Sequence, residues 1–378
     1  MTSRKRHPVA PAAAAFASAL RAGAAETRRD GACRYARVRE DFRGVPRGVV
    51  CVDGRIVPDY PRIPRLVALR AGLDRYLRTP FRVEEKIDGF NVRVFRCQDG
   101  WAAVTRSGVL CPFTQDRLPD LVGDERLQRL FRKHPDLVLC AEVAGRGNPY
   151  MAAASRHGGD DVALYVFDLM RLDTVEFLSP AERDALVNEY DLPRAPALGT
   201  FRREDNEALN AEILRLDTLG AEGVVLKPES GGDRFKYVCP SINVADIGTE
   251  AALALEVPGE FYTHRLARLV IALRELGGIE DLDALGGEFG RLLATGFNGA
   301  VSDLEDHGTV TQEVTVRLRE ARSADALIAH LNHESRTIRA EELGRRFNGT
   351  HWELSLRKVF RRSTDRLREL LDGQAVID

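Results

Sequence analysis

The eleven residues from Phe81 to Asn91 constrain the fold and the chemistry of this chain more than any other part of its sequence. They read Phe-Arg-Val-Glu-Glu-Lys-Ile-Asp-Gly-Phe-Asn, which predicts a strand that ends at Lys86 and enters a sharp turn at Asp88-Gly89. A lysine at a strand end, beside a carboxylate and a glycine, is well placed to act as an amine nucleophile. A Lys-x-Asp-Gly string also arises by chance, and most exposed lysines only aid solubility. The rest of the chain must therefore decide its role.

Length and composition describe an ordinary globular protein. A chain of 378 residues is long enough for two or more domains, and 44% hydrophobic with 30% charged residues is a typical balance. The 55 basic and 57 acidic residues nearly cancel, so any nucleic-acid-binding surface must be local. The six cysteines include no Cys-x-x-Cys pair, which disfavours a zinc site or a disulfide framework and favours reduced thiols in the cytoplasm.

The N-terminus resembles an export signal only loosely. Basic residues precede an alanine-rich run, but alanine is a weak hydrophobe, and Pro8 and Pro11 interrupt the run. We expect residues 1–30 to be a flexible or loosely helical extension. No stretch of about 18 apolar residues occurs, so we expect no membrane span.

The pattern from residue 31 to residue 243 predicts an α+β fold. Residues 31–70 predict a small N-terminal domain with a hairpin around Asp53-Gly54. Residues 71–243 alternate apolar strands with short helices, and Asp99-Gly100 is expected to turn one strand into the next. We expect antiparallel sheets that frame a cleft. The expected strands are 91–97, 101–106, 137–144, 162–169, 224–227 and 235–238, and the expected helices are 118–134, 181–190 and 206–219.

The pattern changes after Asn243. Apolar residues at a spacing of three and four predict an amphipathic helix over 261–276 and another over 282–297. Alternation predicts a strand at 310–318, and two further helices are expected at 324–333 and 352–371. The last segment is rich in arginine, which is typical of a solvated face and would also suit RNA contact.

Four more strings follow Lys86 and carry groups of one chemical theme. They supply carboxylates for a metal, an aromatic ring for a base and lysines for phosphates. Each has an ordinary structural explanation: Glu142 ends an apolar strand, Phe167 alternates with core residues, and Glu222-Gly223 precedes a buried strand. Their joint order is hard to attribute to chance. The strings are Thr105–Gly108, Ala141–Tyr150, Tyr165–Leu169 and Glu222–Lys227 followed by Arg234–Tyr237.

In this order the strings resemble the motifs of the covalent nucleotidyltransferase superfamily of polynucleotide ligases and mRNA capping enzymes. Lys86-Ile-Asp-Gly resembles motif I, Glu142 the glutamate of motif III, and Phe167 the aromatic of motif IIIa. Glu222-Gly-Val-Val-Leu-Lys227 resembles motif IV, and Lys236 the second lysine of motif V. Arg234 replaces the usual first lysine of motif V, which leaves the role of that position open because arginine and lysine differ in geometry.

Within that superfamily the chain most resembles the homodimeric archaeal-type ATP-dependent RNA ligases, from about residue 33 to the end. The resemblance implies an ATP-grasp-like nucleotidyltransferase domain at 71–243, a helical dimerisation domain at 244–305 and a C-terminal domain at 306–378. It also implies a homodimer that acts on RNA with 5′-phosphate and 3′-hydroxyl ends.

The resemblance also implies a mechanism and a set of site residues. Lys86 would attack the α-phosphate of ATP to form lysyl-AMP, and the AMP would pass to the RNA 5′-phosphate before strand joining. Because a free lysine has a pKa of about 10.4, neighbouring charge or burial must lower that value. Mg²⁺ (or Mn²⁺) would be held by Asp88, Glu142 and Glu222. The residues expected to contact the nucleotide are Glu85, Asn91, Arg106, Glu142, Phe167, Lys227 and Lys236, with Glu85 reading the base.

Three alternatives remain at this point. A DNA ligase commonly has arginine at the position of Asn91 and a five-stranded barrel after motif V. A capping enzyme shares that barrel, typically has threonine at the position of Ile87 and uses GTP. A non-catalytic RNA-binding protein on the same fold would not need Lys86, although this chain retains it.

Overall fold

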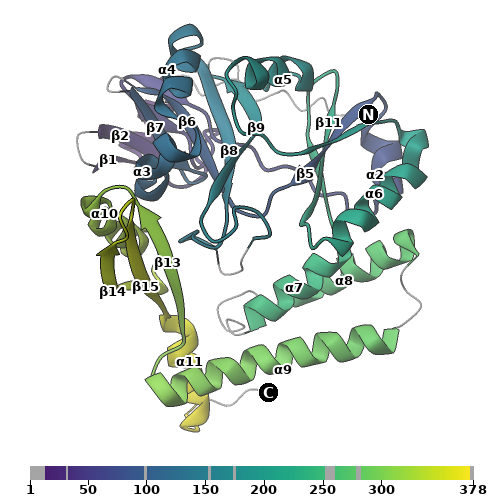
Figure 1. Cartoon of the computed structure of the whole chain (residues 1–378), viewed down its shortest axis with the longest axis vertical. Coiled ribbons are helices and arrows are strands. Elements are labelled where there is room, and N and C mark those ends of the chain that lie inside the picture. The colour runs from purple at the N-terminus through teal and green to yellow at the C-terminus, as the bar shows by residue number, and fades with distance from the viewer. Residues whose placement is uncertain are drawn as a thin grey trace.

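The computed structural model describes residues 13–30, 33–97, 100–151, 155–172, 176–251, 260–277 and 282–374. Two four-stranded sheets stand side by side at its centre (Figure 1). A third sheet, formed by the N-terminal residues, packs on the outer face of one of them, and helices lie below. The predicted α+β class with antiparallel sheets is confirmed. Asp99 of the predicted Asp99-Gly100 turn lies outside the described residues.

The N-terminal unit is a helix on a four-stranded antiparallel sheet of order β1-β2-β3-β4. Phe16 and Ala19 of its helix are buried in a core with Val38 and Val49. Residues 13–30 are therefore packed helix and strand, which corrects their prediction as a flexible or loosely helical extension; residues 1–12 lie outside the described residues. The elements are α1 (Ala13–Arg21), β1 (Ala25–Asp30), β2 (Cys33–Val38), β3 (Val50–Val52) and β4 (Arg55–Val57).

The two central sheets are antiparallel throughout. One has the order β10-β5-β11-β12 and the other β7-β6-β8-β9. The chain passes from the first to the second directly after Lys86, through the turn at Asp88-Gly89. Their strands are β5 (Phe81–Lys86), β6 (Phe90–Cys97), β7 (Gly100–Thr105), β8 (Leu137–Ala144), β9 (Ala163–Arg171), β10 (Ala197–Phe201), β11 (Gly223–Pro228) and β12 (Phe235–Val238).

Helices cover the outer faces of these sheets and complete two cores. Leu118, Leu127 and Leu130 pack with β6 and β8, whereas Leu73 and Ile213 pack with β5 and β11. The helix predicted over 118–134 is two helices, because Gly123 with φ of +98° separates them. The helices are α2 (Leu69–Tyr76), α3 (Pro112–Leu121), α4 (Asp124–Lys133), α5 (Pro180–Glu189) and α6 (Asn206–Thr218), with a 3₁₀ turn at Arg203–Asp205.

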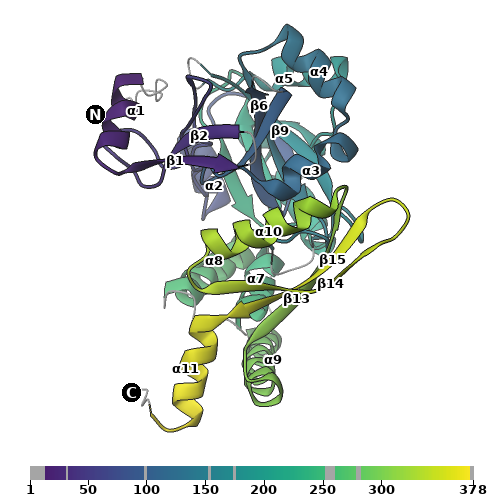
Figure 2. The same cartoon turned by 90° about the vertical axis from the view of Figure 1, so that its left-hand side faces the viewer.

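After β12 the described residues form the helices α7, α8 and α9 and then a three-stranded sheet of order β13-β15-β14, which lies between α10 and α11 (Figure 2). The prediction of one helix over 352–371 was wrong in its first half. Leu354 and Leu356 alternate as buried residues of β15, which pairs with β13 on one side and β14 on the other. The elements are α7 (Pro240–Ala251), α8 (Glu260–Leu276), α9 (Leu282–His307), β13 (Thr311–Leu318), α10 (Ala321–Glu334), β14 (Ile338–Phe347), β15 (Trp352–Phe360) and α11 (Arg361–Leu371).

Shared cores fix the late elements against the central sheets. Val316 and Leu327 belong to the same buried cluster as Leu118 of α3. The Arg117 guanidinium spans this junction, since it lies 2.9 Å from Asp161 and donates to the carbonyl oxygen of Arg317. On the other side, Ala272 of α8 packs into the core of the β5 sheet. None of the helices described has the length and apolarity needed to cross a membrane.

Candidate active site

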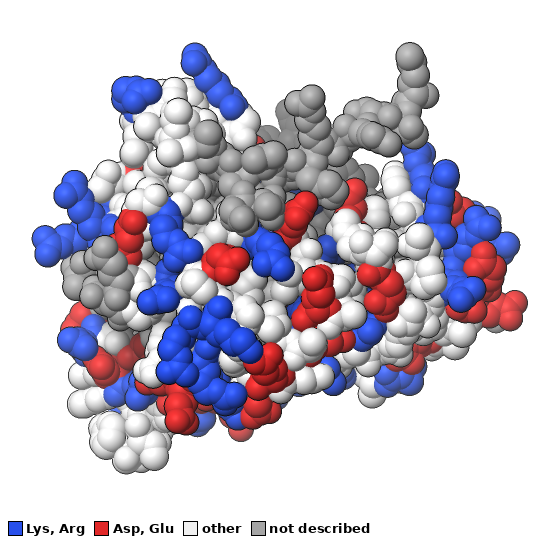
Figure 3. Space-filling view, turned by 90° about the horizontal axis from the view of Figure 1, so that it is seen from above, with Lys and Arg blue, Asp and Glu red and all other residues white. Residues whose placement is uncertain are grey.

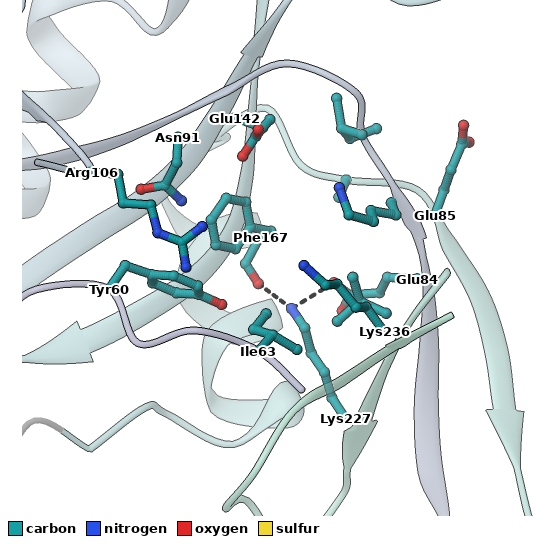
Figure 4. Close-up of a pocket in the computed structure, with 14 residues that line it drawn as sticks. Tyr60, Ile63, Glu84, Glu85, Asn91, Arg106, Glu142, Phe167, Lys227 and Lys236 are labelled. Carbon is teal, nitrogen blue, oxygen red and sulfur yellow. Dashed lines mark hydrogen bonds and ion pairs between the residues drawn. The ribbon is translucent and has the colours of Figure 1, made fainter. Parts of the chain in front are cut away.

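A pocket opens between the two central sheets at the end of β5 (Figure 4). Lys86 and all seven residues predicted to contact the nucleotide line it, so the sequence-based prediction gathered residues that the fold does bring together. The lining residues are Tyr60, Ile63, Glu84, Glu85, Lys86, Ile87, Asn91, Arg106, Glu142, Phe167, Ala195, Val225, Lys227 and Lys236.

Lys86 is held by acidic neighbours. Its Nζ forms an ion pair and hydrogen bond with Glu222, whose backbone precedes the residue that pairs with Lys86 across β5 and β11. Burial opposes the charge of Lys86, but Glu222 and Glu142 outweigh burial and raise its pKa. This shift is opposite to the lowered pKa that was expected for the nucleophile.

The three predicted metal ligands surround Lys86 and repel one another. Burial raises the pKa of Glu142 to about 8, against the influence of Lys86 and with that of Glu222. Burial and Glu222 likewise raise the pKa of Asp88 to about 6. Such acids ionise readily once positive charge arrives. The described residues contain no cluster of three acidic, histidine or cysteine ligands already close enough to hold an ion. The donor set suits a hard cation bound partly through water.

Two glycines allow the site to form. A Cβ on Gly89 would lie 2.4 Å from the carbonyl oxygen of Val143, beside Glu142. Gly223 has φ of +147°, and its Cβ would lie 2.1 Å from the carbonyl oxygen of Tyr237. Each glycine directly follows an acidic residue of the site, so the carboxylates of Asp88 and Glu222 depend on close backbone approaches that only glycine permits.

Phe167 enters the pocket because β9 carries a bulge. Asp168 pairs with Cys140 and Val166 with Ala141, which leaves Phe167 outside the ladder. The carbonyl oxygen of Phe167 is then free to accept hydrogen bonds from Lys227 Nζ and from Arg183 at 2.7 Å. No pattern in the sequence predicted this bulge.

Lys227 is a floor residue of the pocket. Its side chain is only 1% exposed, and its Nζ donates to Glu84 at 2.8 Å as well as to the Phe167 carbonyl (Figure 4). This geometry differs from the predicted phosphate contact, because a buried amine that has three internal acceptors, Asp168 among them, is not available to a ligand.

Tyr60 is a pocket residue that the sequence analysis missed. It stands edge-on to the Phe167 ring, with centroids 5.2 Å apart, and its hydroxyl donates to Asp168 at 2.9 Å. Pro58, Pro61 and Pro64 hold the surrounding segment extended, which was the only signal that could have indicated it.

Arg234 lies beneath the pocket and not in it. Its Nη2 donates to Asp168 at 3.1 Å and to the carbonyl oxygen of Leu178 at 3.1 Å, and its guanidinium lies 4.1 Å from the Phe177 ring centroid. The arginine that replaces the first lysine of motif V is therefore a buried tie between β12 and β9.

The carboxylate of Glu85 points away from that of Glu84 (Figure 4), as the alternation of side chains along β5 requires. Arg156 donates two hydrogen bonds of 2.9 and 3.0 Å to this carboxylate, and His157 forms a third of 2.7 Å. These partners lower the pKa of Glu85 although burial acts in the opposite direction. A carboxylate so fully occupied does not suit the predicted reading of a base.

Lys236, Asn91 and Arg106 present groups that a ligand could use. Burial, together with Lys86 and Arg65, lowers the pKa of Lys236 to about 8. The lowered pKa that was predicted for Lys86 is thus found on Lys236. Asn91 Oδ1 is buried without a hydrogen-bond partner, which leaves it free to accept from a hydroxyl. Arg106 is exposed at the pocket mouth.

A second cavity lies between α11 and the C-terminal sheet. Arg339, Arg357, Arg361 and Arg368 line it together with Glu341 and Asp365. Figure 3 shows the face seen from above, on which basic and acidic side chains are interspersed.

Comparison with known proteins decides the family. The family model "RNA ligase" matches residues 79–238, which contain both central sheets and every predicted site residue. The model "Ligase Pab1020 C-terminal region" matches residues 250–374. This chain belongs to the RNA ligase family. The predicted resemblance to the archaeal-type branch is confirmed by the second model, which covers the helices and sheet that follow β12.

Several solved structures resemble this RNA ligase family chain along almost its whole length. "Putative ATP-dependent DNA ligase from Aquifex aeolicus" is 36% identical, with a TM-score of 0.89, and the match covers 96% of this chain and 99% of that one. Archaeal ATP-dependent RNA ligase in form 1 is 25% identical with a TM-score of 0.84, and form 2 is 24% identical with 0.86; each match covers 95% of both chains.

One curated relative is an uncharacterized protein of Methanocaldococcus jannaschii. It is 26% identical over 238 residues, which span 61% of this chain and 59% of the relative. The match therefore covers less than two thirds of that relative's length.

Proposed function

We propose that this chain is an ATP-dependent RNA ligase that joins a 5′-phosphate end to a 3′-hydroxyl end through a lysyl-AMP at Lys86. The observation that carries the proposal is the position of Lys86 at the end of β5, in a pocket whose other residues are an aromatic ring, lysine and carboxylates. The family membership of residues 79–238 supports the same reaction class.

Lys86 acts as the nucleophile once its ion pair with Glu222 is broken. Its Nζ forms a bond to the α-phosphorus, pyrophosphate leaves, and the amine loses a proton. Lys236 lies beside Lys86 and has a lowered pKa. It stabilises negative charge on the phosphate both before and after Lys86 loses its proton. Little acid–base chemistry is required, since phosphoryl transfer depends chiefly on positioning and charge neutralisation.

Phe167 and Tyr60 form the adenine end of the pocket. Lys227 and Arg183 fix the Phe167 carbonyl and so hold the ring in place. Asn91 Oδ1, buried and without a partner, accepts from a ribose hydroxyl. We assign Lys227 to this supporting role and keep Lys236 as the lysine that contacts phosphate.

Asp88, Glu142 and Glu222 would hold Mg²⁺ (or Mn²⁺). The ion would supply positive charge between the carboxylates and the triphosphate. Burial and neighbouring carboxylates raise the pKa values of Asp88 and Glu142, so occupation of the site would displace protons from these two acids and weaken the hold of Glu222 on Lys86.

RNA is preferred over DNA as the polymer, although one similar structure carries a DNA ligase name. Asn91 occupies a position at which DNA ligases commonly have arginine. After β12 the described residues form five helices and a three-stranded sheet rather than a five-stranded barrel. The missing barrel and the lack of threonine at Ile87 also disfavour a capping enzyme. A retained Lys86 disfavours a non-catalytic RNA-binding protein.

We further propose a homodimer, a division into domains and a cytoplasmic location. Residues 244–305 would form the dimerisation domain, because Leu266 and Ile271 of α8 and Phe297 of α9 are exposed large hydrophobics. A monomer mass in light scattering would contradict the homodimer. The division into domains at 70, 243 and 305 and the cytoplasmic location follow from the family resemblance and the six free cysteines.

Labelled nucleotides test the activity. The protein is incubated with Mg²⁺ and α-labelled ATP or GTP, denatured, and examined for bound label. We expect label from ATP alone. The labelled protein is then given nicked or single-stranded substrates that differ only in RNA or DNA ends. Efficient sealing of DNA alone would replace RNA with DNA as the substrate, and absence of label from ATP would refute the proposal.

A further inference from the structure

Arg65 extends the row of charged residues that crosses the pocket. It forms a parallel bridge with Lys236, fixed by hydrogen bonds from Leu66 N to the Lys236 carbonyl at 2.8 Å and from Lys236 N to the Pro64 carbonyl at 2.9 Å. Residues paired across a ladder point to the same face, and Lys236 lines the pocket. Arg65 therefore projects on the pocket side, at the edge beyond β12.

Two arginines of α8 face Arg65. Arg265 and Arg268 are one helical turn apart, and the Arg65 and Arg265 charges both act on the pKa of Arg268, which burial lowers to about 10. The helix is fixed in this place, because the Glu275 carboxylate near its end accepts from the backbone N of Leu69 at 2.6 Å.

The cluster has too little negative charge for its size. Glu222 and Asp246 are the acids whose charges act on Arg65, but Glu222 already pairs with Lys86, and Arg265 lies 2.9 Å from Asp246. Among the described residues, Arg65 and Arg268 form no ion pair, and Arg268 Nε is buried without a hydrogen-bond partner. Unpaired guanidinium groups beside a phosphate-transfer pocket call for an anion.

We propose that Arg65 and Arg268 bind the pyrophosphate portion of ATP. This inference rests on the proposed function of Lys86. The ligand is a pyrophosphate group, and Lys236 separates it from the nucleophile. Arg265 maintains the cluster through its pair with Asp246 and its contact with the Phe261 ring, 3.4 Å from the centroid.

The order of the strands gives the in-line geometry that the reaction needs. Gly223 of β11 pairs with Lys86 of β5, whereas Lys236 of β12 pairs with Val225 of β11, and Arg65 lies beyond Lys236. Lys236 and Arg65 are therefore displaced from Lys86 by two residues along the strands. Three strand spacings of about 4.8 Å and this offset place the backbones of Lys86 and Arg65 roughly 16 Å apart. An α-phosphate above β11 would have the nucleophile on one side and the arginines on the other. As the bond from Lys86 Nζ to phosphorus forms, the bond to the bridging oxygen breaks, and its electron pair leaves with pyrophosphate toward Arg65.

Reversal of the first step tests this assignment. Purified enzyme–AMP is mixed with increasing pyrophosphate, and the ATP produced is measured for Arg65→Gln, Arg268→Gln and Arg268→Lys. Loss of a charge-assisted contact should raise the half-saturating pyrophosphate concentration about tenfold or more for each glutamine variant, with a smaller rise for the lysine variant. Arg274→Gln, an exposed change on the same helix, is the matched control and should behave as wild type.

A second assay separates pyrophosphate from RNA phosphates. Sealing of pre-adenylated RNA needs no pyrophosphate, so the Arg65 and Arg268 variants should seal it within twofold of wild type. Normal pyrophosphate dependence would overturn the proposal, and normal pyrophosphate dependence with impaired sealing would assign the arginines to RNA. Failure of wild-type protein to form enzyme–AMP would refute the proposed function itself, which is a distinguishable result. Unfolding midpoints check that each variant is folded.

Discussion

Arg234 Nη2 lies 3.1 Å from Asp168 Oδ1, in the fully buried layer under the nucleotide pocket. Tyr60 and Lys227 bind the same carboxylate from the pocket side. Asp168 thus joins the 58–65 segment, β9, β11 and β12, and the residues of the adenine end are held through it. Arg234, which stands at the position of the first motif V lysine, binds Asp168. This explains why the cation at that position need not contact phosphate.

Breaking this joint should destabilise the protein. Asp168→Asn leaves Arg234 and Lys227 buried without their charge partner, and such changes cost about 3–5 kcal/mol of the free energy of unfolding. Arg234→Lys keeps the charge but loses the fork of donors, so we expect a smaller loss of about 1–3 kcal/mol. Urea unfolding at neutral pH measures both. An Asp168→Asn variant as stable as wild type would contradict the account.

The same carboxylate should give acid-dependent stability. Burial alone would raise the pKa of Asp168, but Arg234 and Lys227 hold it at about 2, below the usual value of about 3.9 for Asp. Its contribution, roughly 2 kcal/mol, is therefore complete above pH of about 4 and is lost as the pH falls toward 2. Unfolding curves across this window should show a weaker pH dependence in Asp168→Asn than in wild type. Equal slopes for the two proteins would argue against the lowered pKa.

Removal of the Glu222 charge should make Lys86 a better free amine. Because Glu222 helps to raise the pKa of Lys86, Glu222→Gln should shift that pKa downward and allow Lys86 to react at lower pH. The rate of Lys86 carbamylation by cyanate, followed by peptide mass spectrometry across pH, measures the shift. Lys133, which pairs with Glu189 on the surface, is an internal reference and should not change. An unchanged Lys86 midpoint would exclude this pairing in solution.

The turn after Lys86 should tolerate no side chain at Gly89. A Cβ there would lie 2.4 Å from the Val143 carbonyl oxygen, so Gly89→Ala must displace the turn or β8 and with it Asp88 or Glu142. We expect the rate of enzyme–AMP formation to fall by more than about tenfold, since misplacement by about 1 Å can cost a hundredfold. Gly299→Ala in α9, where no atom lies within 4 Å of the added carbon, is the control. Equal rates for both variants would show that the close approach is unimportant.

Glu85 should support structure without selecting the base. Glu85→Gln loses a charge-assisted grip by Arg156 and His157, worth about 1–3 kcal/mol of unfolding free energy. The preference for ATP over GTP in enzyme labelling should stay the same. A changed preference with unchanged stability would restore the role that the sequence suggested.

The sequence predicted the site better than it predicted side-chain roles. The resemblance of the ordered motifs to the nucleotidyltransferase superfamily implied that Lys86, Glu142, Phe167 and Lys236 share one site, and the fold places all four in one pocket. It did not reveal which way Glu85 points or that Lys227 is internally bonded, since both depend on partners from distant elements. Phe167 needed a bulge that has no sequence signature.

For the fold, too, the sequence predicted the elements that have a local pattern and missed those that depend on tertiary contacts. Strands with regular alternation and helices with regular spacing were predicted, including β13 and α10. The 352–371 segment was predicted as one helix because its arginines obscured the alternation of Leu354 and Leu356. β15 is a strand because β13 and β14 pair with it on both sides, which is a tertiary cause. Residues 13–30 likewise gain their structure by packing on Val38 and Val49.

The central claim is that Lys86 carries AMP, and peptide mapping tests it most directly. The protein is incubated with ATP and Mg²⁺, digested, and analysed by mass spectrometry for the mass added by one AMP. The account predicts a single adenylated site at Lys86, with no addition in Lys86→Ala. AMP on any other residue, or undiminished adenylation of Lys86→Ala, would contradict it.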